Sequence, residues 1–169
     1  MNNIVNSNIK LTIVGSLKSG KQYISSYLAG KQYDQQIIGK ELNNIELDQF
    51  LQLKKLNGKI QIWDSSVLDR FMLIYPFYYN NAKIILVVFN FGDQDSFDKC
   101  TDYANYIQNN CSSIVLLVGT RFTDDKIISV DEAIDFAQFN DFQFFELKND
   151  NFDALKTVVQ KIVLKVLKN

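Results

Sequence analysis

The fold is decided by one stretch near the amino terminus, Gly15-Ser16-Leu17-Lys18-Ser19-Gly20-Lys21-Gln22. An apolar run at residues 9–14 predicts a strand before it, and residues 20–28 have helical spacing, with Gly30 as the stop. A strand, the spacing G-x-x-x-x-G-K and a helix are typical of a phosphate-binding loop. Backbone N–H groups at the helix start and the lysine hold phosphate oxygens in such loops. The candidate phosphate-binding residues are Gly15, Lys18, Ser19, Gly20, Lys21 and Gln22.

Further strands are predicted by short apolar runs. Residues 84–89 and 114–118 are continuously apolar, which is typical of strands buried on both faces of a parallel sheet, and residues 142–147 predict another. Segments 45–56 and 59–63 also favour strands. The Asn57-Gly58 dipeptide between them predicts a two-residue hairpin turn.

Helices are predicted between these strands. Ser129 and Glu132 form a capping box ahead of residues 133–139, and residues 152–168 carry an apolar face opposite a lysine-rich one. We expect this last helix to pack on the sheet; the alternative for a basic amphipathic helix is a membrane surface. The order predicts an α/β domain with a six-stranded, mostly parallel sheet, one antiparallel hairpin and helices on both faces. Residues 1–169 form one domain, with residues 1–8 as a polar amino-terminal extension.

Composition excludes several classes of function. The 169 residues include 19 acidic and 18 basic ones, which argues against a polybasic nucleic-acid module, so no nucleic-acid partner is expected. The absence of histidine excludes histidine-dependent catalytic triads and histidine-ligated zinc, and two cysteines cannot build a disulfide framework. Apolar runs are too short to span a membrane, residues 1–8 do not resemble a secretory signal, and no terminal cysteine offers a lipid anchor. We therefore expect a cytoplasmic protein, with a cytoskeletal or ciliary assembly as one setting.

Beyond the phosphate-binding loop, the chain resembles the Ras-like small GTPases, and the Rab group most, over residues 9–168. Residues 61–71 resemble the family's WDTAGQERF segment, and residues 78–82 its YYRGA. Residues 87–97 resemble VVYDVTDxxSF, and residues 117–119 the LVG that precedes the guanine-reading NKxD motif. The resemblance implies the P-loop NTPase fold of small GTPases. It also implies GTP or GDP with Mg²⁺ as ligands, and Asp64 as a residue of that site.

Six motif positions depart from the family. Gln22 replaces the Ser or Thr that ligates Mg²⁺, and Ile37 stands where switch I has its Thr. Val67 and Leu68 replace the Gly of DxxG and the Gln that orients the attacking water. The remaining two departures are Thr123, at the Asp of NKxD, and the loop at residues 148–150, at SAK. Asp124 follows one residue late, where it could read guanine only if the loop shifts.

These losses favour a non-hydrolysing interaction or structural subunit of a larger assembly, with no nucleotide, no Mg²⁺ and no catalytic residue. The retained Lys21 and Asp64 leave a second hypothesis open, a GTP-binding switch with very slow or no hydrolysis. Alternatively, Lys21 and Asp64 are retained only by inheritance from a nucleotide-binding ancestor. Lys21 would then pair with Asp64, or the phosphate site would hold another anion. A third class, an ATP-using P-loop enzyme, would need catalytic acids that the sequence does not place.

Partner-binding residues are expected near the switch region. Trp63 fits a partner contact or the core equally well, and the apolar residues 71–79 favour a protein interface.

Other polar and aromatic groups have simpler explanations. Cys100 and Cys111 lack the basic neighbours that would make a thiol reactive. The aspartates at 93, 95, 98 and 102 are better explained by a helix start than by calcium. A group of phenylalanines is expected to fill the core around the last strand: Phe136, Phe139, Phe142, Phe144 and Phe145.

Overall fold

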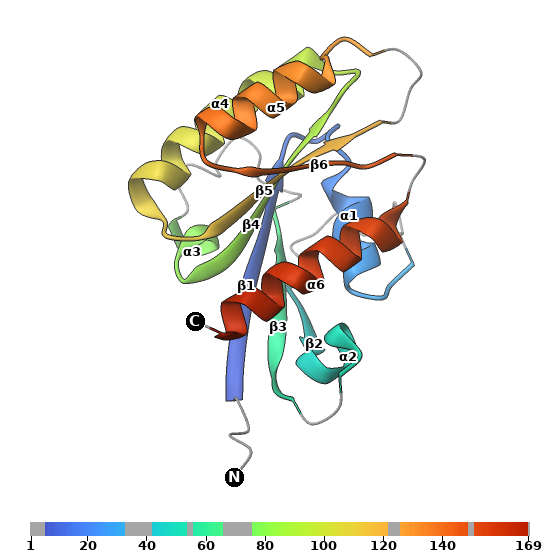
Figure 1. The fold of residues 1–169 in the computed structure, drawn as a ribbon, viewed down its shortest axis with the longest axis vertical. Helices are drawn as coiled ribbons and strands as arrows, with labels where there is room; N and C mark the ends of the chain where they lie inside the picture. The colour runs from blue at the N-terminus through green and yellow to red at the C-terminus, as the bar shows by residue number, and fades with distance from the viewer. Residues whose placement is uncertain are drawn as a thin grey trace.

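The computed structural model describes residues 6–32, 42–53, 56–65, 76–121, 126–148 and 151–168 (Figure 1). Six strands form one sheet in the order β2-β3-β1-β4-β5-β6. Their bounds are Asn6–Gly15 (β1), Leu42–Glu46 (β2), Asn57–Asp64 (β3), Ala82–Asn90 (β4), Ile114–Thr120 (β5) and Gln143–Glu146 (β6). Only the β2–β3 pair is antiparallel; the other four neighbouring pairs are parallel. The predicted six-stranded α/β architecture is therefore confirmed.

Helices cover both faces of this sheet (Figure 1). They are Lys21–Leu28 (α1), Leu47–Leu51 (α2), Pro76–Tyr79 (α3), Gln94–Asn110 (α4), Val130–Phe139 (α5) and Phe152–Lys168 (α6). Buried side chains of α1, α2 and α6 pack on one face, and those of α3, α4 and α5 on the other. Strand β4 serves both cores, because Ile84, Leu86 and Val88 face the first while Ile85, Val87 and Phe89 face the second.

Two predicted helices follow their sequence signals closely. The capping box before α5 is present, since the Glu132 amide donates to Ser129 Oγ over 3.1 Å and the Ser129 amide donates to Glu132 Oε2 over 3.0 Å. Helix α6 buries Leu155, Val159, Ile162 and Val163 against the sheet, as its apolar face predicts. None of the helices within the described residues is long and apolar enough to cross a membrane.

The predicted hairpin turn at Asn57-Gly58 is wrong, although the antiparallel pairing of β2 with β3 is right. Residues 47–51 form α2 instead of a strand, because Leu47, Phe50 and Leu51 have helical spacing and are buried together. Gly58 lies within β3 opposite Ser7 of β1, and a Cβ on it would lie 2.0 Å from the Ser7 carbonyl oxygen. The glycine allows two strands to approach closely, which is the other common reason for glycine in a strand.

Two smaller predictions also need correction. Residues 6–8 are not an extension, because they belong to β1 and pair with residues 57–59. Phe139 does not fill the core: it ends α5 with 88% of its surface exposed, whereas Phe142 is buried. In the apolar segment 71–79, residues 71–75 lie outside the described part; Tyr78 and Tyr79 are buried in the core.

Gly58→Ala is expected to lower the free energy of unfolding by about 1–3 kcal/mol, because the new methyl group would overlap the Ser7 carbonyl. Gly30→Ala is the matched control, since a Cβ there meets no atom within 4 Å and only the φ of 69° opposes it. Urea denaturation of both variants measures the difference. Equal stability of the two variants would contradict the close approach of β1 to β3.

Candidate functional site

The phosphate-binding loop lies where the sequence predicts it, between β1 and α1. Gly15 ends β1 opposite Val88 of β4 with a φ of 155°, and a Cβ there would lie 2.3 Å from the Val88 carbonyl oxygen. Gly20 precedes α1 with a φ of 89° and is its N-cap. Both glycines of the motif are thus required by the backbone itself.

Lys21 is the first residue of α1 and is almost completely buried. Its ammonium group donates to the Gly15 carbonyl over 2.7 Å and to the Ser16 carbonyl over 3.0 Å, so the side chain folds back over the loop. Ser19 Oγ donates to the Ser16 carbonyl over 2.8 Å, whereas Lys18 lies exposed. These bonds hold the ammonium group beside the loop backbone, as a phosphate site needs.

The start of α1 also suits an anion. No side chain caps the helix at Gly20 and no acidic residue occupies its first turn, so the positive end of the helix dipole faces the loop. Gln22 follows Lys21 and is half-buried. Its carboxamide oxygen stands on a longer side chain than the Ser or Thr hydroxyl that the family has at this position, so it would not place a ligand atom where that hydroxyl does.

Asp64 reaches the same edge of the sheet from the neighbouring strand. It ends β3 in register with Ile13 of β1 and is buried. The next residue, Ser65, fixes this end, because its hydroxyl donates to the Ile13 carbonyl over 3.0 Å. The structure therefore places Lys21 and Asp64 after adjacent parallel strands, as the motif spacing implies.

Thr120 connects the loop to the other half of the site. It ends β5 at the position that corresponds to the first residue of the family's NKxD motif. Its Oγ1 lies 2.6 Å from the Ser19 carbonyl oxygen and 3.0 Å from the Phe89 carbonyl oxygen, so its single proton is shared within the protein. Thr120 is fully buried and ties the loop to the sheet.

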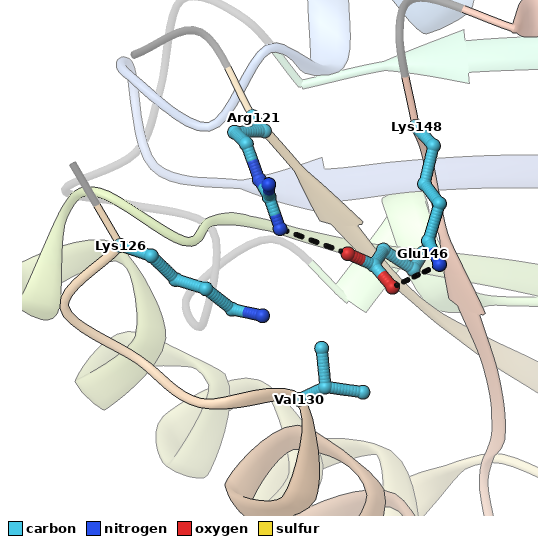
Figure 2. Close-up of a pocket in the computed structure, with 5 residues that line it drawn as sticks. All are labelled: Arg121, Lys126, Val130, Glu146 and Lys148. Carbon is cyan, nitrogen blue, oxygen red and sulfur yellow. Dashed lines mark hydrogen bonds and ion pairs between the residues drawn. The ribbon is translucent and has the colours of Figure 1, made fainter. Parts of the chain in front are cut away.

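A pocket of about 330 Å³ opens beyond Thr120, at the carboxyl ends of β5 and β6 (Figure 2). Arg121, Lys126, Val130, Glu146 and Lys148 line it. Arg121 Nη2 donates to Glu146 Oε1 over 3.0 Å, and Lys148 Nζ lies 3.3 Å from Glu146 Oε2. Sequence reasoning missed Arg121, Lys126 and Glu146, although Arg121 and Glu146 lie at the ends of predicted strands, where ligands of parallel sheets bind.

Several predicted site positions lie outside the described residues. They are Ile37 of switch I, Val67 and Leu68 of switch II, Thr123 and Asp124 after β5, and residues 149–150 after β6. Of the SAK counterpart, only Lys148 is described, and its ammonium group is paired with Glu146. The losses at these positions stay predictions from the sequence.

The described residues fit the two parts of a guanine nucleotide unequally. The loop supplies glycine-permitted backbone, a buried ammonium group and an uncapped helix start, which fit a phosphate chain. At the other end, the hydroxyl of Thr120 is engaged with backbone carbonyls, and each oxygen of Glu146 already accepts from a cation. The carboxylate that the structure describes at this end is therefore engaged with cations, and Asp124 lies outside the described residues.

Trp63 combines the two expected roles of core packing and partner contact, because its half-buried ring contacts both core and surface residues. It packs edge-on against Tyr78, with ring centroids 6.0 Å apart, and against Phe77, with centroids 6.3 Å apart. The Lys10 ammonium group lies 4.2 Å from the centre of the Trp63 ring, and partial burial lowers the pKa of that lysine. Phe77 remains 36% exposed, so an apolar edge faces outward here.

Other candidate groups are inert. Burial raises the pKa of the Cys100 thiol and of the Cys111 thiol, which disfavours the reactive thiolate form of both. Within the described ranges, no group of three or more acidic, cysteine or histidine side chains could hold a metal ion.

Thr120→Val is expected to lower the free energy of unfolding by about 1–3 kcal/mol, because it leaves buried carbonyls of Ser19 and Phe89 without their donor. It should also speed amide hydrogen exchange across residues 16–20. Thr120→Ser keeps the hydroxyl and should exchange like the wild type. Unchanged exchange in the valine variant would show that the loop is held by other contacts.

Comparison with known proteins agrees with this architecture. The profile of the Ras family matches residues 10–168. The chain is 29% identical over 164 residues to the GTP-binding protein YPT1 of Saccharomyces cerevisiae, covering 90% of this chain and 78% of that protein. It is 23% identical over 174 residues to the Ras-related protein Rab-18-B of Danio rerio, covering 99% of this chain and 83% of that protein. A third relative is the Ras-related protein RABF2a of Arabidopsis thaliana, 25% identical over 164 residues, with 93% and 80% covered.

The family match spans both halves of the site, from the loop after β1 to α6, and the relatives are Rab and Ypt proteins. The chain therefore belongs to the Ras family and is a Rab-related small GTPase by fold.

Proposed function

We propose that this protein is a Rab-related member of the Ras family that has lost GTP hydrolysis and acts as an interaction or structural subunit of a larger protein assembly. The observation that carries the proposal is the state of the base-binding end. The Thr120 hydroxyl donates to backbone carbonyl oxygens, and the Glu146 carboxylate is paired with Arg121 and Lys148. The family's guanine-reading carboxylate is replaced by Thr123, and the Glu146 carboxylate at this end of the site is already engaged with two cations.

The switch sequences support the same proposal. Leu68 stands where the family orients the attacking water with a glutamine, and a leucine side chain has no hydrogen-bonding group. Val67 replaces the glycine whose amide meets the γ-phosphate, and Ile37 replaces the switch I threonine. Each change removes a contact that acts only when a γ-phosphate is present, so hydrolysis by the family mechanism is lost.

The phosphate-binding loop supports a second candidate function. Lys21, Gly15 and Gly20 retain the geometry of a working phosphate-binding loop, and relatives such as YPT1 are named as GTP-binding proteins. The chain would then be a switch that binds GTP through its phosphates and hydrolyses it very slowly or not at all. Asp124 would supply guanine recognition in that case.

The nucleotide content of the native protein separates the two functions. The protein purified without added nucleotide, then denatured and analysed by chromatography, is expected to release guanine nucleotide far below stoichiometric amounts. Titration with a fluorescent GTP analogue should give weak binding that is the same in the wild type, in Lys21→Met and in the exposed-lysine control Lys83→Met. Stoichiometric GTP or GDP, or tight binding lost only in Lys21→Met, would instead establish the switch.

The partner surface of this subunit is proposed to lie at the switch region and the apolar segment 71–79. Of that segment, the structure describes α3, where Phe77 is exposed beside the half-buried Trp63. Exposed aromatic side chains next to a packed tryptophan are typical of interface hot spots. A cytoplasmic setting, and a cytoskeletal or ciliary assembly within it, is the kind of place such a subunit would occupy.

Phe77→Asp is expected to release the assembly partner, because it places a charge at the apolar edge beside Trp63. Phe139→Asp is the control, since Phe139 is even more exposed but ends α5 on another part of the surface. Quantitative mass spectrometry of the tagged protein purified from its native cells would compare the stoichiometry of co-purifying chains. Loss of the same partner from both variants, or from neither, would place the interface elsewhere.

A further inference from the structure

The outward face of α5 carries a stripe of acidic side chains that ends in an exposed aromatic ring. Asp131 and Asp135 are exposed four residues apart, and Phe139 follows after four more residues with 88% of its surface exposed. Four residues are about one helical turn, or about 6 Å along the axis, so the three side chains share one face. The opposite face of α5 packs on the sheet through Ala133 and Ala137. This α5 stripe is therefore acidic at its beginning and apolar at its end.

The outward face of α6 carries a stripe of complementary chemistry. Thr157, Lys161 and Lys165 are exposed at the same four-residue spacing, and Lys168 is exposed three residues further on. The Thr157 hydroxyl donates to the Asp153 carbonyl over 2.9 Å within the helix, which leaves its methyl group for an apolar contact. This α6 stripe is therefore uncharged at its beginning and basic towards its end.

The charges of both stripes are not neutralised within the part of the chain that the structure describes, which includes α5 and α6 from end to end. Asp131 and Asp135 form no ion pair with any described residue. The same holds for Lys161 and Lys165, although Asp141 lines a small pocket together with Lys165. Helices α5 and α6 pack on opposite faces of the sheet (Figure 1). The two stripes of one molecule therefore cannot meet each other, but they are open to the stripes of a second molecule.

One antiparallel register gives three positions of each stripe a suitable partner. Because both helices repeat every four residues along their stripes, a single alignment brings two acids onto two lysines and the aromatic ring onto the uncharged position. The opposing residues are Asp131 and Lys165, Asp135 and Lys161, and Phe139 and Thr157. Complementary charges at matched spacing fix the register of a contact, and aromatic side chains are enriched where such contacts are made.

We propose that this protein associates head to tail with further copies of itself, with the α5 stripe of one copy docked on the α6 stripe of the next. Two different surfaces meet in such a contact, so each copy can take a neighbour on either side, and the contact repeats into a ring or a filament. Exposed charge pairs contribute little affinity each, so the association is weak and sensitive to salt. The proposal goes beyond the proposed function, because it names a second copy of this chain as a partner and does not depend on the surface at Phe77 or on nucleotide binding at Lys21.

Sedimentation velocity of the full chain over a range of protein concentrations tests the association. At low salt, the average mass is expected to rise with concentration beyond the mass of a dimer. Raising the ionic strength from about 0.01 M to about 1 M shortens the Debye length from about 30 Å to about 3 Å, and this should return the protein to the monomer.

Charge reversal tests the two stripes. The double variant Asp131→Lys with Asp135→Lys should lower the association constant about tenfold or more, because attractive pairs become repulsive. The double variant Lys161→Glu with Lys165→Glu should have the same effect. An equimolar mixture of the two variants should associate like the wild type, since every contact between them again joins opposite charges.

The matched control is Asp98→Lys with Asp102→Lys, which changes the charge by the same amount at exposed positions of α4 and should associate like the wild type. Thermal unfolding checks that each variant is folded. The proposal is overturned by a wild type that stays monomeric at low salt, by a mass that stops at the dimer, or by stripe variants that associate as the control does. A mixture of stripe variants that fails to associate would also overturn it. None of these results depends on the nucleotide content of the native protein, so the two proposals fail separately.

Discussion

The functional end of the molecule depends on the close approach of Gly15 to the carbonyl of Val88. Strand β1 lies inside the sheet between β3 and β4, and it must leave the sheet while still paired with β4. A Cβ at this point would lie 2.3 Å from the Val88 oxygen, so only glycine allows the turn. The loop that follows, the position of Lys21 and the start of α1 all depend on that turn.

The same contacts would keep a phosphate-binding loop in the fold whether or not the protein turns over nucleotide. Lys21 is buried, and a buried ammonium group without hydrogen bonds is strongly unfavourable. Its bonds to the Gly15 and Ser16 carbonyls make it part of the fold, and Thr120 adds a further bond to the loop at Ser19. Each buried hydrogen bond of this kind contributes about 0.5–1.5 kcal/mol to the stability of the fold. Stability alone therefore favours keeping the motif, so its presence is weak evidence for nucleotide binding.

The layers of the fold were predictable from the sequence, because buried positions recur along a helix or strand with a fixed spacing that apolar residues reveal. The continuous apolar runs at residues 84–89 and 114–118 are the central strands, and the capping box at Ser129 starts α5 as expected. The Asn57-Gly58 turn was wrong because glycine has two uses in strands, and only the partner strand distinguishes them. The prediction that Phe139 fills the core was wrong, because an apolar side chain at the end of a helix can face either the sheet or the solvent.

The candidate site was predictable in one half only. Phosphate binding depends on local backbone, so Gly15, Gly20 and Lys21 are readable from spacing. The pocket beyond β5 is assembled from three separate segments, and no local pattern connects Arg121 with Lys126 and Glu146.

The charged side chains of the pocket beyond β5 influence which ligands it can bind. In a guanine site the carboxylate must be the strongest acceptor that the ligand meets, because guanine presents N–H donors to it. Here the carboxylate of Glu146 is mostly buried, with only 12% of its side chain exposed, and Arg121 and Lys148 have each taken one of its oxygens. Among the described residues, the carboxylate at this end is therefore engaged with cations, while the loop at Lys21 is held by hydrogen bonds that belong to the fold itself.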